Sequence, residues 1–329
     1  MRYFSTFSGI GGFELGIKLA YEQISGIKNI SKKTKRQEAD KKIRGKKRQF
    51  KQLPEYAPAR LSCIGYSEID KYATKVYQKH FPEHKNYGDI TKIDERALPD
   101  FDILVGGFPC QSFSIAGKRG GFNDTRGTLF FDVARILKEK QPPMVLLENV
   151  KGLLSHEGGN TFRTILGTFD ELGYDAEWQV LNSKNHGVPQ NRERVFIIGH
   201  LRGTSRPEVF PFGQNSYSSP KLSGQYSNTL TARYYAGQAN GTYIAESKFN
   251  EQKIRRLTPT ECERLQGFPD GWTEVGMEFP VDEYHKGEHK ILKIEIKISD
   301  SQRYKMLGNA VTVNVVQAIM EKMIDTINE

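Results

Sequence analysis

A cysteine and a glutamate each follow a short apolar run of the chain, and their side chains have complementary chemistry. Cys110 lies in the glycine-rich stretch Gly106-Gly107-Phe108-Pro109-Cys110-Gln111-Ser112 after the apolar run Phe101–Val105, and Glu148 directly follows Met144–Leu147. A thiolate is a strong nucleophile and a carboxyl group exchanges protons, so the pair indicates covalent catalysis with proton transfer. The alternative for Cys110 alone is a buried structural cysteine. The alternative for Glu148 alone is a charged residue at the point where a strand reaches the surface.

Two arginines add groups that bind anions or carbonyl oxygens. Gln190, Arg192 and Arg194 alternate through the stretch that leads into the apolar run Val195–Gly199, so their side chains are expected on one side of a strand. Two guanidinium groups there can hold a carbonyl or a phosphate. A strand start neutralised by Glu193 is the alternative.

A glycine turn near the N-terminus is suited to a nucleotide-like ligand. The turn Ser8–Gly12 follows a predicted strand at Arg2–Phe7, and Gly9 and Gly11 permit close backbone approach to an adenosine-type ligand. A strict dinucleotide fingerprint is weakened because Glu14 stands where a third glycine is needed. Glu68, at the end of a second predicted strand, is where such folds bind a ribose. A simple tight turn is the alternative.

Alternating strands and helices must position these groups. Apolar runs predict strands at Arg2–Phe7, Leu61–Tyr66, Phe101–Val105, Met144–Leu147, Asp175–Leu181 and Val195–Gly199. Helical spacing follows several of them, so the fold class is α/β with a mostly parallel, doubly wound sheet whose strand ends carry the active site. The stretch Leu201–Asn250 lacks a helical period and predicts a small inserted β/loop domain. Further elements are a helix capped by Thr258-Pro259-Thr260-Glu261, a strand at Ile291–Ile298 and a last helix with Val313, Val316, Ile319, Met320 and Met323 on one face.

Composition excludes several classes of protein. Among the 329 residues, 37% are hydrophobic, 26% are charged and 11% are aromatic, which is typical of a globular chain and excludes disorder throughout. Apolar runs fall short of the roughly 20 residues that span a bilayer, and we expect no signal peptide and no membrane partner. Cys63, Cys110 and Cys262 are too few and too scattered for a disulfide scaffold or a zinc site, so a cytoplasmic protein without a metal is expected.

The positive charge is concentrated in one segment. Lys28–Arg60 holds 13 basic and three acidic residues, a net charge of +10, whereas the whole chain has +9. Such a block is typical of a surface that binds a polyanion. A solvated loop that only aids solubility is the alternative.

Taken together, these stretches resemble the DNA (cytosine-5) methyltransferases over nearly the whole chain. The matching motifs are Phe4–Gly16, Glu68, Asp89-Ile90, Phe108-Pro109-Cys110-Gln111, Glu148-Asn149-Val150, Gln190-x-Arg192-x-Arg194, Arg256–Pro269 and Gly308-Asn309-Ala310-Val311. Thr229-Leu230 resembles the recurrent dipeptide of the family's target-recognition region. The basic insertion and a long Gly276–Ser301 stretch depart from the family pattern.

The resemblance implies S-adenosyl-L-methionine as the cofactor. Phe7 is then expected to stack on the adenine and Glu68 to bind the ribose. The full set of implied cofactor residues is Phe7, Gly9, Gly11, Glu68, Ile69, Asp89, Ile90, Pro109, Leu129 and Asn309.

The resemblance also implies methyl transfer to C5 of a cytosine flipped out of duplex DNA. Cys110 is expected to attack C6, Glu148 to protonate N3, and Arg194, with Arg192, to bind the O2 side and hold the loop. A glycine-spaced loop, Ser112–Gly127, is expected to close over the base. The implied DNA contacts are Gln111, Ser114, Lys118, Arg119, Arg126, Thr229 and Arg233.

The expected organisation has three parts. Residues 1–200 form the catalytic and cofactor-binding domain with the insertion at 28–60, residues 201–250 the target-recognition domain, and residues 251–329 return to the catalytic domain. We expect a monomer that binds double-stranded DNA, with a possible cognate restriction endonuclease.

Three other functions are considered. An amino-methylating enzyme needs an Asp/Asn/Ser-Pro-Pro-aromatic tetrapeptide, and Gln141-Pro142-Pro143-Met144 fails at both ends. A family member that methylates tRNA is a closer rival, although a populated recognition region favours DNA. A catalytically dead DNA-binding protein is disfavoured because Cys110, Glu148 and Arg194 are all present.

Overall fold

A computed structural model describes most of the chain. The described residues are 1–26, 61–109, 129–204, 208–212, 226–236, 242–248, 251–278, 283–285, 288–290 and 294–327. Cys110, the loop Ser112–Gly127 and the basic insertion therefore lie outside the described residues.

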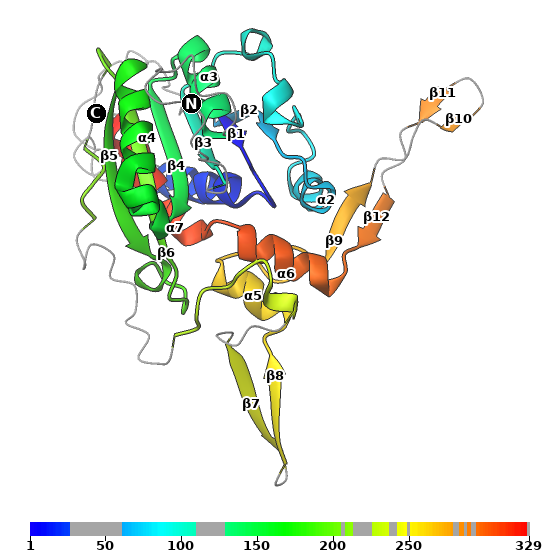
Figure 1. Ribbon diagram of the computed structural model, residues 1–329. Coiled ribbons are helices and arrows are strands. Elements are labelled where there is room, and N and C mark those ends of the chain that lie inside the picture. The colour runs from blue at the N-terminus through cyan, green and yellow to red at the C-terminus, as the bar shows by residue number, and fades with distance from the viewer. Residues whose placement is uncertain are drawn as a thin grey trace, which may run out of the picture.

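A six-stranded sheet forms the centre of the molecule (Figure 1). Its strands, in spatial order, are β2 (Ser62–Ser67), β1 (Arg2–Thr6), β3 (Ile103–Gly107), β4 (Met144–Val150), β6 (Glu193–Leu201) and β5 (Tyr174–Asn182). Strands β2, β1, β3 and β4 pair in parallel, which confirms the predicted mostly parallel sheet. Strand β6 runs antiparallel to both β4 and β5, because the short connection from β5 to β6 has no room for a crossover helix.

Helices cover both faces of this sheet. On one face, the helix of residues 12–26 and α7 (Val313–Ile327) pack against side chains such as Leu146. On the other face, α3 (Leu129–Lys140) and α4 (Asn160–Glu171) pack against the next residue along the strand, Leu147. Alternate strand residues thus enter opposite cores, which explains why the strands are apolar without interruption.

A second cluster of elements lies below the sheet in Figure 1. Helices α5 (Pro259–Leu265) and α6 (Asp300–Asn309) share an apolar core with Ala73 and Val76 of α2 (Lys71–His80) and with Leu230. The predicted capping box is present, because Thr258 accepts a hydrogen bond from the Glu261 N–H and Glu261 bonds back to the Thr258 N–H.

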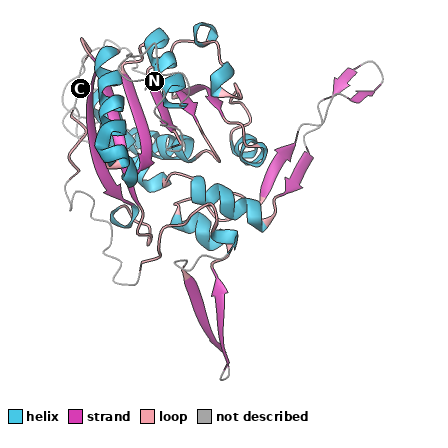
Figure 2. Cartoon of the chain, in the orientation of Figure 1, coloured by secondary structure: helices cyan, strands magenta, loops and turns pink. Residues whose placement is uncertain are grey.

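Two strand-only arms extend from this cluster (Figure 2). One is the hairpin of β7 (Tyr243–Lys248) and β8 (Glu251–Arg256), so the predicted domain boundary at residue 250 falls inside a hairpin. The other contains β9 (Val275–Glu278), paired with β12 (Ile294–Lys297), and beyond them β10 (Glu283–His285), paired with β11 (Glu288–Lys290). Short 3-10 turns complete the fold at Ile90–Lys92 (η1), Glu95–Ala97 (η2), Lys151–Leu154 (η4), His156–Gly159 (η5), Ser183–Asn185 (η6) and Tyr234–Ala236 (η7).

Candidate active site

A cleft of about 620 Å³ opens at the C-terminal ends of β1, β3 and β4, where a parallel sheet carries its active site. Eight predicted site residues line it: Phe7, Gly9, Glu68, Pro109, Glu148, Arg192, Arg194 and Asn309. These residues come from segments up to 302 positions apart in the sequence, between Phe7 and Asn309. The fold therefore brings five of the predicted cofactor residues and three of the predicted catalytic residues to one cavity.

Glu148 and Arg194 form an ion pair inside the cleft. Arg194 Nε lies 2.9 Å from Glu148 Oε1, and the two side chains are 16% and 13% exposed. Antiparallel pairing of β4 with β6 brings them together, since Val150 stands opposite Arg194 two residues after Glu148. Burial raises the pKa of Glu148, and the positive charges of Arg194 and Arg192 oppose that rise. The carboxyl group is thus prepared to hold or donate a proton.

Glycine at position 107 leaves room for this carboxyl group. Gly107 pairs with Glu148 across β3 and β4, and a Cβ atom at residue 107 would lie 3.0 Å from Glu148 Oε2. Any larger side chain at this position would press on the carboxyl group.

The chain that leads to Cys110 is anchored by the residue next to Glu148. Buried Asn149 donates its Nδ2 hydrogen to the Phe108 carbonyl at 2.8 Å. Phe108 itself is buried, and Pro109, the last described residue of this segment, lines the cleft. Strand β3 thus delivers the segment before Cys110 to the cleft beside Glu148; Cys110 lies outside the described residues.

The glycine turn and Glu68 form the other half of the cleft. Glu68 Oε2 accepts a hydrogen bond from the Gly9 N–H at 2.8 Å, and Oε1 accepts from the N–H groups of Ile69 and Asp70 at 2.8 and 2.7 Å. Burial raises the pKa of this carboxyl group, although the three N–H donors favour its charged form.

This half of the cleft suits S-adenosylmethionine. Phe7 and Gly9 both have left-handed backbone, with φ of +52° and +56°, and the space that a Cβ of Gly9 would occupy is open. An aromatic ring and a carboxylate thus stand beside an open backbone turn. The ring fits an adenine and the carboxylate fits a ribose diol.

Five predicted cofactor residues are described but do not border the cleft: Gly11, Ile69, Asp89, Ile90 and Leu129. Gly11 packs so closely on the Phe81 ring that a Cβ there would lie 2.6 Å from it. The Asp89 side chain caps η1 by accepting from Thr91, and Ile90 is buried in the core. Their contact with the cofactor stays a prediction.

Sequence reasoning missed an ion pair at the edge of the cleft. Lys305 Nζ lies 2.7 Å from Asp70 Oδ2, and both residues line the cavity. Asp70 also caps α2 through the N–H groups of Tyr72 and Ala73. Asp70 could have been found from the sequence, because it directly follows Glu68-Ile69. Nothing in the sequence around Lys305 indicates this ion pair, because its partner lies 235 residues away.

The two arginines of the Gln190-x-Arg192-x-Arg194 motif differ in what they contact. Arg194 holds Glu148, whereas Arg192 donates to the backbone carbonyls of Leu230, Gly308 and Ala310 at 2.8, 3.2 and 2.8 Å. Arg192 borders the cleft, and these hydrogen bonds connect it to three protein carbonyls; its contact with the base stays a prediction. Desolvation lowers the pKa of Arg192 to about 9.

The predicted DNA contacts are only partly described. Gln111, Ser114, Lys118, Arg119 and Arg126 lie outside the described residues. Thr229 donates its hydroxyl hydrogen to the Asn191 carbonyl at 2.7 Å, and Arg233 is exposed directly before η7.

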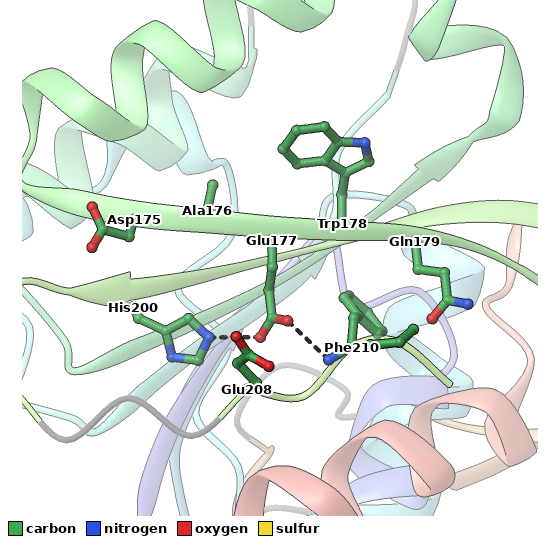
Figure 3. A pocket seen from close by; sticks show the side chains of 9 residues that line it. Asp175, Ala176, Glu177, Trp178, Gln179, His200, Glu208 and Phe210 are labelled. Atoms are coloured by element: carbon green, nitrogen blue, oxygen red, sulfur yellow. Dashed lines mark hydrogen bonds and ion pairs between the residues drawn. The ribbon is translucent and has the colours of Figure 1, made fainter. Parts of the chain in front are cut away.

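A second cleft, of about 650 Å³, lies over strand β5 (Figure 3). In Figure 3, Glu177 and Gln179 point from β5 toward residues 208–212. Glu177 accepts from the N–H groups of Val209 and Phe210 and pairs with His200, which lowers its pKa. These hydrogen bonds hold residues 208–212 against the sheet. The second cleft shares no lining residue with the cleft that contains Glu148.

Two searches of the described residues bear on other kinds of site. Within these ranges, no group of three or more His, Cys, Asp or Glu side chains is arranged to hold a metal ion. None of the described helices has the length and apolar character needed to cross a membrane.

Comparison with known proteins defines the class that this fold and cleft represent. The profile of the C-5 cytosine-specific DNA methylase family matches residues 1–226 and 211–286. The chain therefore belongs to this family, and it is a DNA (cytosine-5)-methyltransferase that uses S-adenosylmethionine as the methyl donor.

Its relatives include bacterial type II methyltransferases. M.NlaX of Neisseria lactamica is 32% identical over 98% of this chain and 96% of its own length. M1.ScrFI of Lactococcus lactis subsp. cremoris is 38% identical over 82% of this chain and 74% of its own. Among solved structures, the Dnmt2 methyltransferase of S. pombe superimposes with a TM-score of 0.66 at 16% identity over the full length of both chains, which shows a shared fold.

Proposed function

We propose that the enzyme methylates C5 of a cytosine flipped out of a specific duplex DNA sequence, through a covalent bond between Cys110 and C6. The observation that carries this proposal is the half-buried Glu148–Arg194 pair, 2.9 Å apart beside the strand that leads to Cys110. Cytosine C5 is too weak a nucleophile to take a methyl group unaided. Addition of the Cys110 thiolate to C6 breaks the ring aromaticity and makes C5 nucleophilic.

Glu148 and Arg194 stabilise the product of this addition, each at a different atom of the base. The protonated Glu148 carboxyl donates to N3, and the Arg194 guanidinium donates to O2, where negative charge develops. Removal of the C5 proton by a base then expels the Cys110 thiolate. Glu148 already holds Arg194 beside the base site, so the arginine needs little reorganisation to reach O2.

The cofactor is held by the opposite wall of the cleft. Phe7 stacks on the adenine, Glu68 binds the ribose, and Gly9, Pro109 and Asn309 shape the cavity around it. When bound, S-adenosylmethionine supplies an electrophilic methyl group on a sulfonium. Ile69, Asp89, Ile90, Leu129 and Gly11 complete the proposed contact set.

The DNA is read by residues 201–250 and gripped by the loop after Cys110. Thr229 and Arg233 belong to the reading region, and Gln111, Ser114, Lys118, Arg119 and Arg126 to the loop. Base edges in the major groove give the specificity and phosphates give the affinity. The enzyme acts as a monomer, and a cognate restriction endonuclease is its proposed cellular counterpart.

Trapping of the covalent intermediate tests this mechanism. Duplex DNA with 5-fluorocytosine at the target should give a denaturation-resistant complex in the presence of S-adenosylmethionine, because fluorine at C5 cannot leave as the proton does. Cys110→Ala should abolish the complex and Cys262→Ala, a change at a buried cysteine in α5, should keep it. A complex with Cys110→Ala, or one formed on tRNA in preference to duplex DNA, would contradict the proposal.

A further inference from the structure

Both backbone polar groups of Leu230 are held by side chains of the Gln190-x-Arg192 stretch. Gln190 Oε1 accepts from the Leu230 N–H at 2.9 Å, and Arg192 Nη1 donates to the Leu230 carbonyl at 2.8 Å. The exposed fractions of Gln190, Arg192 and Leu230 are 0%, 2% and 3%. Water therefore cannot replace either hydrogen bond without a change in the packing.

The same two side chains hold other segments at their remaining donors. Gln190 Nε2 donates to the Leu265 carbonyl at the end of α5, at 2.8 Å. Arg192 Nη2 donates to the carbonyls of Gly308 and Ala310 on either side of Asn309, which lines the cleft. Two side chains thus tie one residue of the recognition region to the end of α5 and to the C-terminal end of α6, which carries a proposed cofactor contact.

Backbone contacts extend this attachment along both segments. The Asn191 N–H donates to the Ser227 carbonyl at 2.8 Å, and the Ser227 N–H donates to the Pro189 carbonyl at 2.9 Å. Thr229 adds its bond to the Asn191 carbonyl. The segment of residues 227–230 therefore lies in register along residues 189–192, directly before the strand that carries Arg194.

Close packing at Gly308 supports the same arrangement. A Cβ atom at residue 308 would lie 2.1 Å from the Thr231 carbonyl carbon and 2.3 Å from the Ala232 nitrogen. The last turn of α6 and the recognition segment thus touch backbone to backbone. Displacement of one must move the other.

We propose that Gln190 and Arg192 are positioning residues that fix residues 226–236 of the recognition region relative to Arg194 and Asn309. They do not bind the target base. They couple the reading of the DNA sequence to the geometry of the catalytic cleft, because one rigid attachment serves both. This inference rests on the proposed function, in which Arg194 binds the base and residues 201–250 read the sequence.

A matched pair of substitutions separates this role from simple stability. Gln190 and Gln266 are both fully buried amides that donate Nε2 to a backbone carbonyl at 2.8 Å, Leu265 for the first and Leu307 for the second. The Gln190 side chain also accepts from the Leu230 N–H, whereas the Gln266 side chain bonds to Leu307, Ala310 and Thr312. Gln190→Met and Gln266→Met therefore remove similar hydrogen bonds, but only Gln190→Met removes one to the recognition region.

The experiment measures the preference of each variant for the target sequence, in addition to its methylation rate. Bisulfite sequencing of DNA methylated by the wild type defines the target, and synthetic duplexes then compare it with its single-base variants. Gln190→Met should raise the KM for target DNA about tenfold and lower the preference for the target over one-base variants about tenfold. The KM for S-adenosylmethionine should change less than about threefold, and Gln266→Met should leave the preference at its wild-type value.

Arg192 supplies a second, milder test. Arg192→Lys keeps a buried cation but cannot reach three carbonyls in the fork geometry of a guanidinium, so part of the preference should remain. Arg192→Met should lose more of it. A large fall in kcat with unchanged site preference, in a folded Arg192→Lys enzyme, would instead place this arginine on the base and overturn the inference.

The trapped 5-fluorocytosine complex distinguishes failure of this inference from failure of the mechanism. Gln190→Met should still form the complex at saturating target DNA, since Cys110, Glu148 and Arg194 are unchanged. If the wild type forms no complex, the proposed mechanism is wrong. If the wild type forms it and Gln190→Met and Arg192→Lys keep full site preference, the positioning role is wrong.

Discussion

Arg194 is ion-paired with Glu148 across strands β6 and β4, so the side chain proposed to hold the base also sets the proton affinity of the carboxyl proposed to protonate it. Burial and the neighbouring cations act on Glu148 in opposite directions, and burial has the larger effect. The pair therefore couples base binding to proton transfer.

Replacement of the Glu148 carboxyl group tests its role directly. Glu148→Gln should lower the rate of methyl transfer by about 10²–10⁴-fold, the usual contribution of general acid–base catalysis, because an amide cannot supply the proton. S-adenosylmethionine affinity should stay within about threefold. Single-turnover methylation and isothermal titration measure the two effects. Glu193→Gln, at an exposed residue paired with Lys151, is the control, and a loss below about tenfold for Glu148→Gln would refute the role.

The pH dependence of the rate should report the Arg194–Glu148 coupling. If the protonated carboxyl is the active form, the rate falls as the pH rises through the pKa of Glu148. Arg194 lowers that pKa, so Arg194→Gln should move the alkaline limb of the kcat profile to higher pH while slowing the reaction. Arg202→Gln, at an exposed arginine paired with Asp170 and Asp175, should leave the limb in place. A limb that moves to lower pH would contradict the assignment.

Glu14 should make the stability of the fold depend on pH. This fully buried residue lies in the helix of residues 12–26, and burial raises its pKa to about 7. The folded state then binds a proton that the unfolded state has lost above its own pKa of about 4.3. The stabilisation is thus complete at low pH and is lost as the pH rises to about 7.

Urea unfolding at pH 5 and pH 8 measures this effect. Relative to Glu14→Gln, whose side chain does not titrate, the wild type should lose about 3 kcal/mol of unfolding free energy over that interval. The comparison between the two proteins cancels the other titrating groups. Equal pH dependence in both would show that Glu14 titrates normally.

The basic insertion should contribute to DNA binding through phosphates. Lys28–Arg60 carries +10, and each phosphate contact adds about 0.9 to the slope of log affinity against log salt. Replacement of the segment by a short Gly-Ser turn should weaken binding and flatten this slope, by about 3.6 if four contacts are lost. Site choice and the rate at saturating DNA should stay the same. An unchanged slope in an active variant would favour the alternative of a solvated loop.

Substitution in the recognition region should change the target. Thr229→Ser keeps the hydroxyl that bonds to Asn191, whereas Arg233→Ala removes an exposed side chain directly before η7. Loss of a base-reading contact typically costs about 1–3 kcal/mol of discrimination. Arg233→Ala should thus alter the bisulfite pattern and Thr229→Ser should preserve it. An unchanged pattern for Arg233→Ala would remove this residue from the reading set.

Local patterns in the sequence were sufficient for much of the catalytic half. The apolar run Met144–Leu147 followed by Glu148 predicted a strand that ends with a carboxyl group; β4 continues two residues further, to Val150, and Glu148 lines the cleft near its C-terminal end. Thr258 and Glu261 predicted a helix start, and the capping box is present. These predictions succeed because the period of apolar residues and the capping chemistry act over a few residues.

Tertiary structure decided what the two arginines do. Alternation placed Arg192 and Arg194 on one side of a strand, and it could not separate them. Their partners do so: Glu148 on the adjacent antiparallel strand for Arg194, and carbonyls 38, 116 and 118 residues away for Arg192. A guanidinium is satisfied by whichever acceptors the fold brings within reach, and the sequence around it does not encode them. The sequence by itself determined the chemistry of each strand end, and the packing of distant segments determined which of these groups face the cleft and which hold the chain.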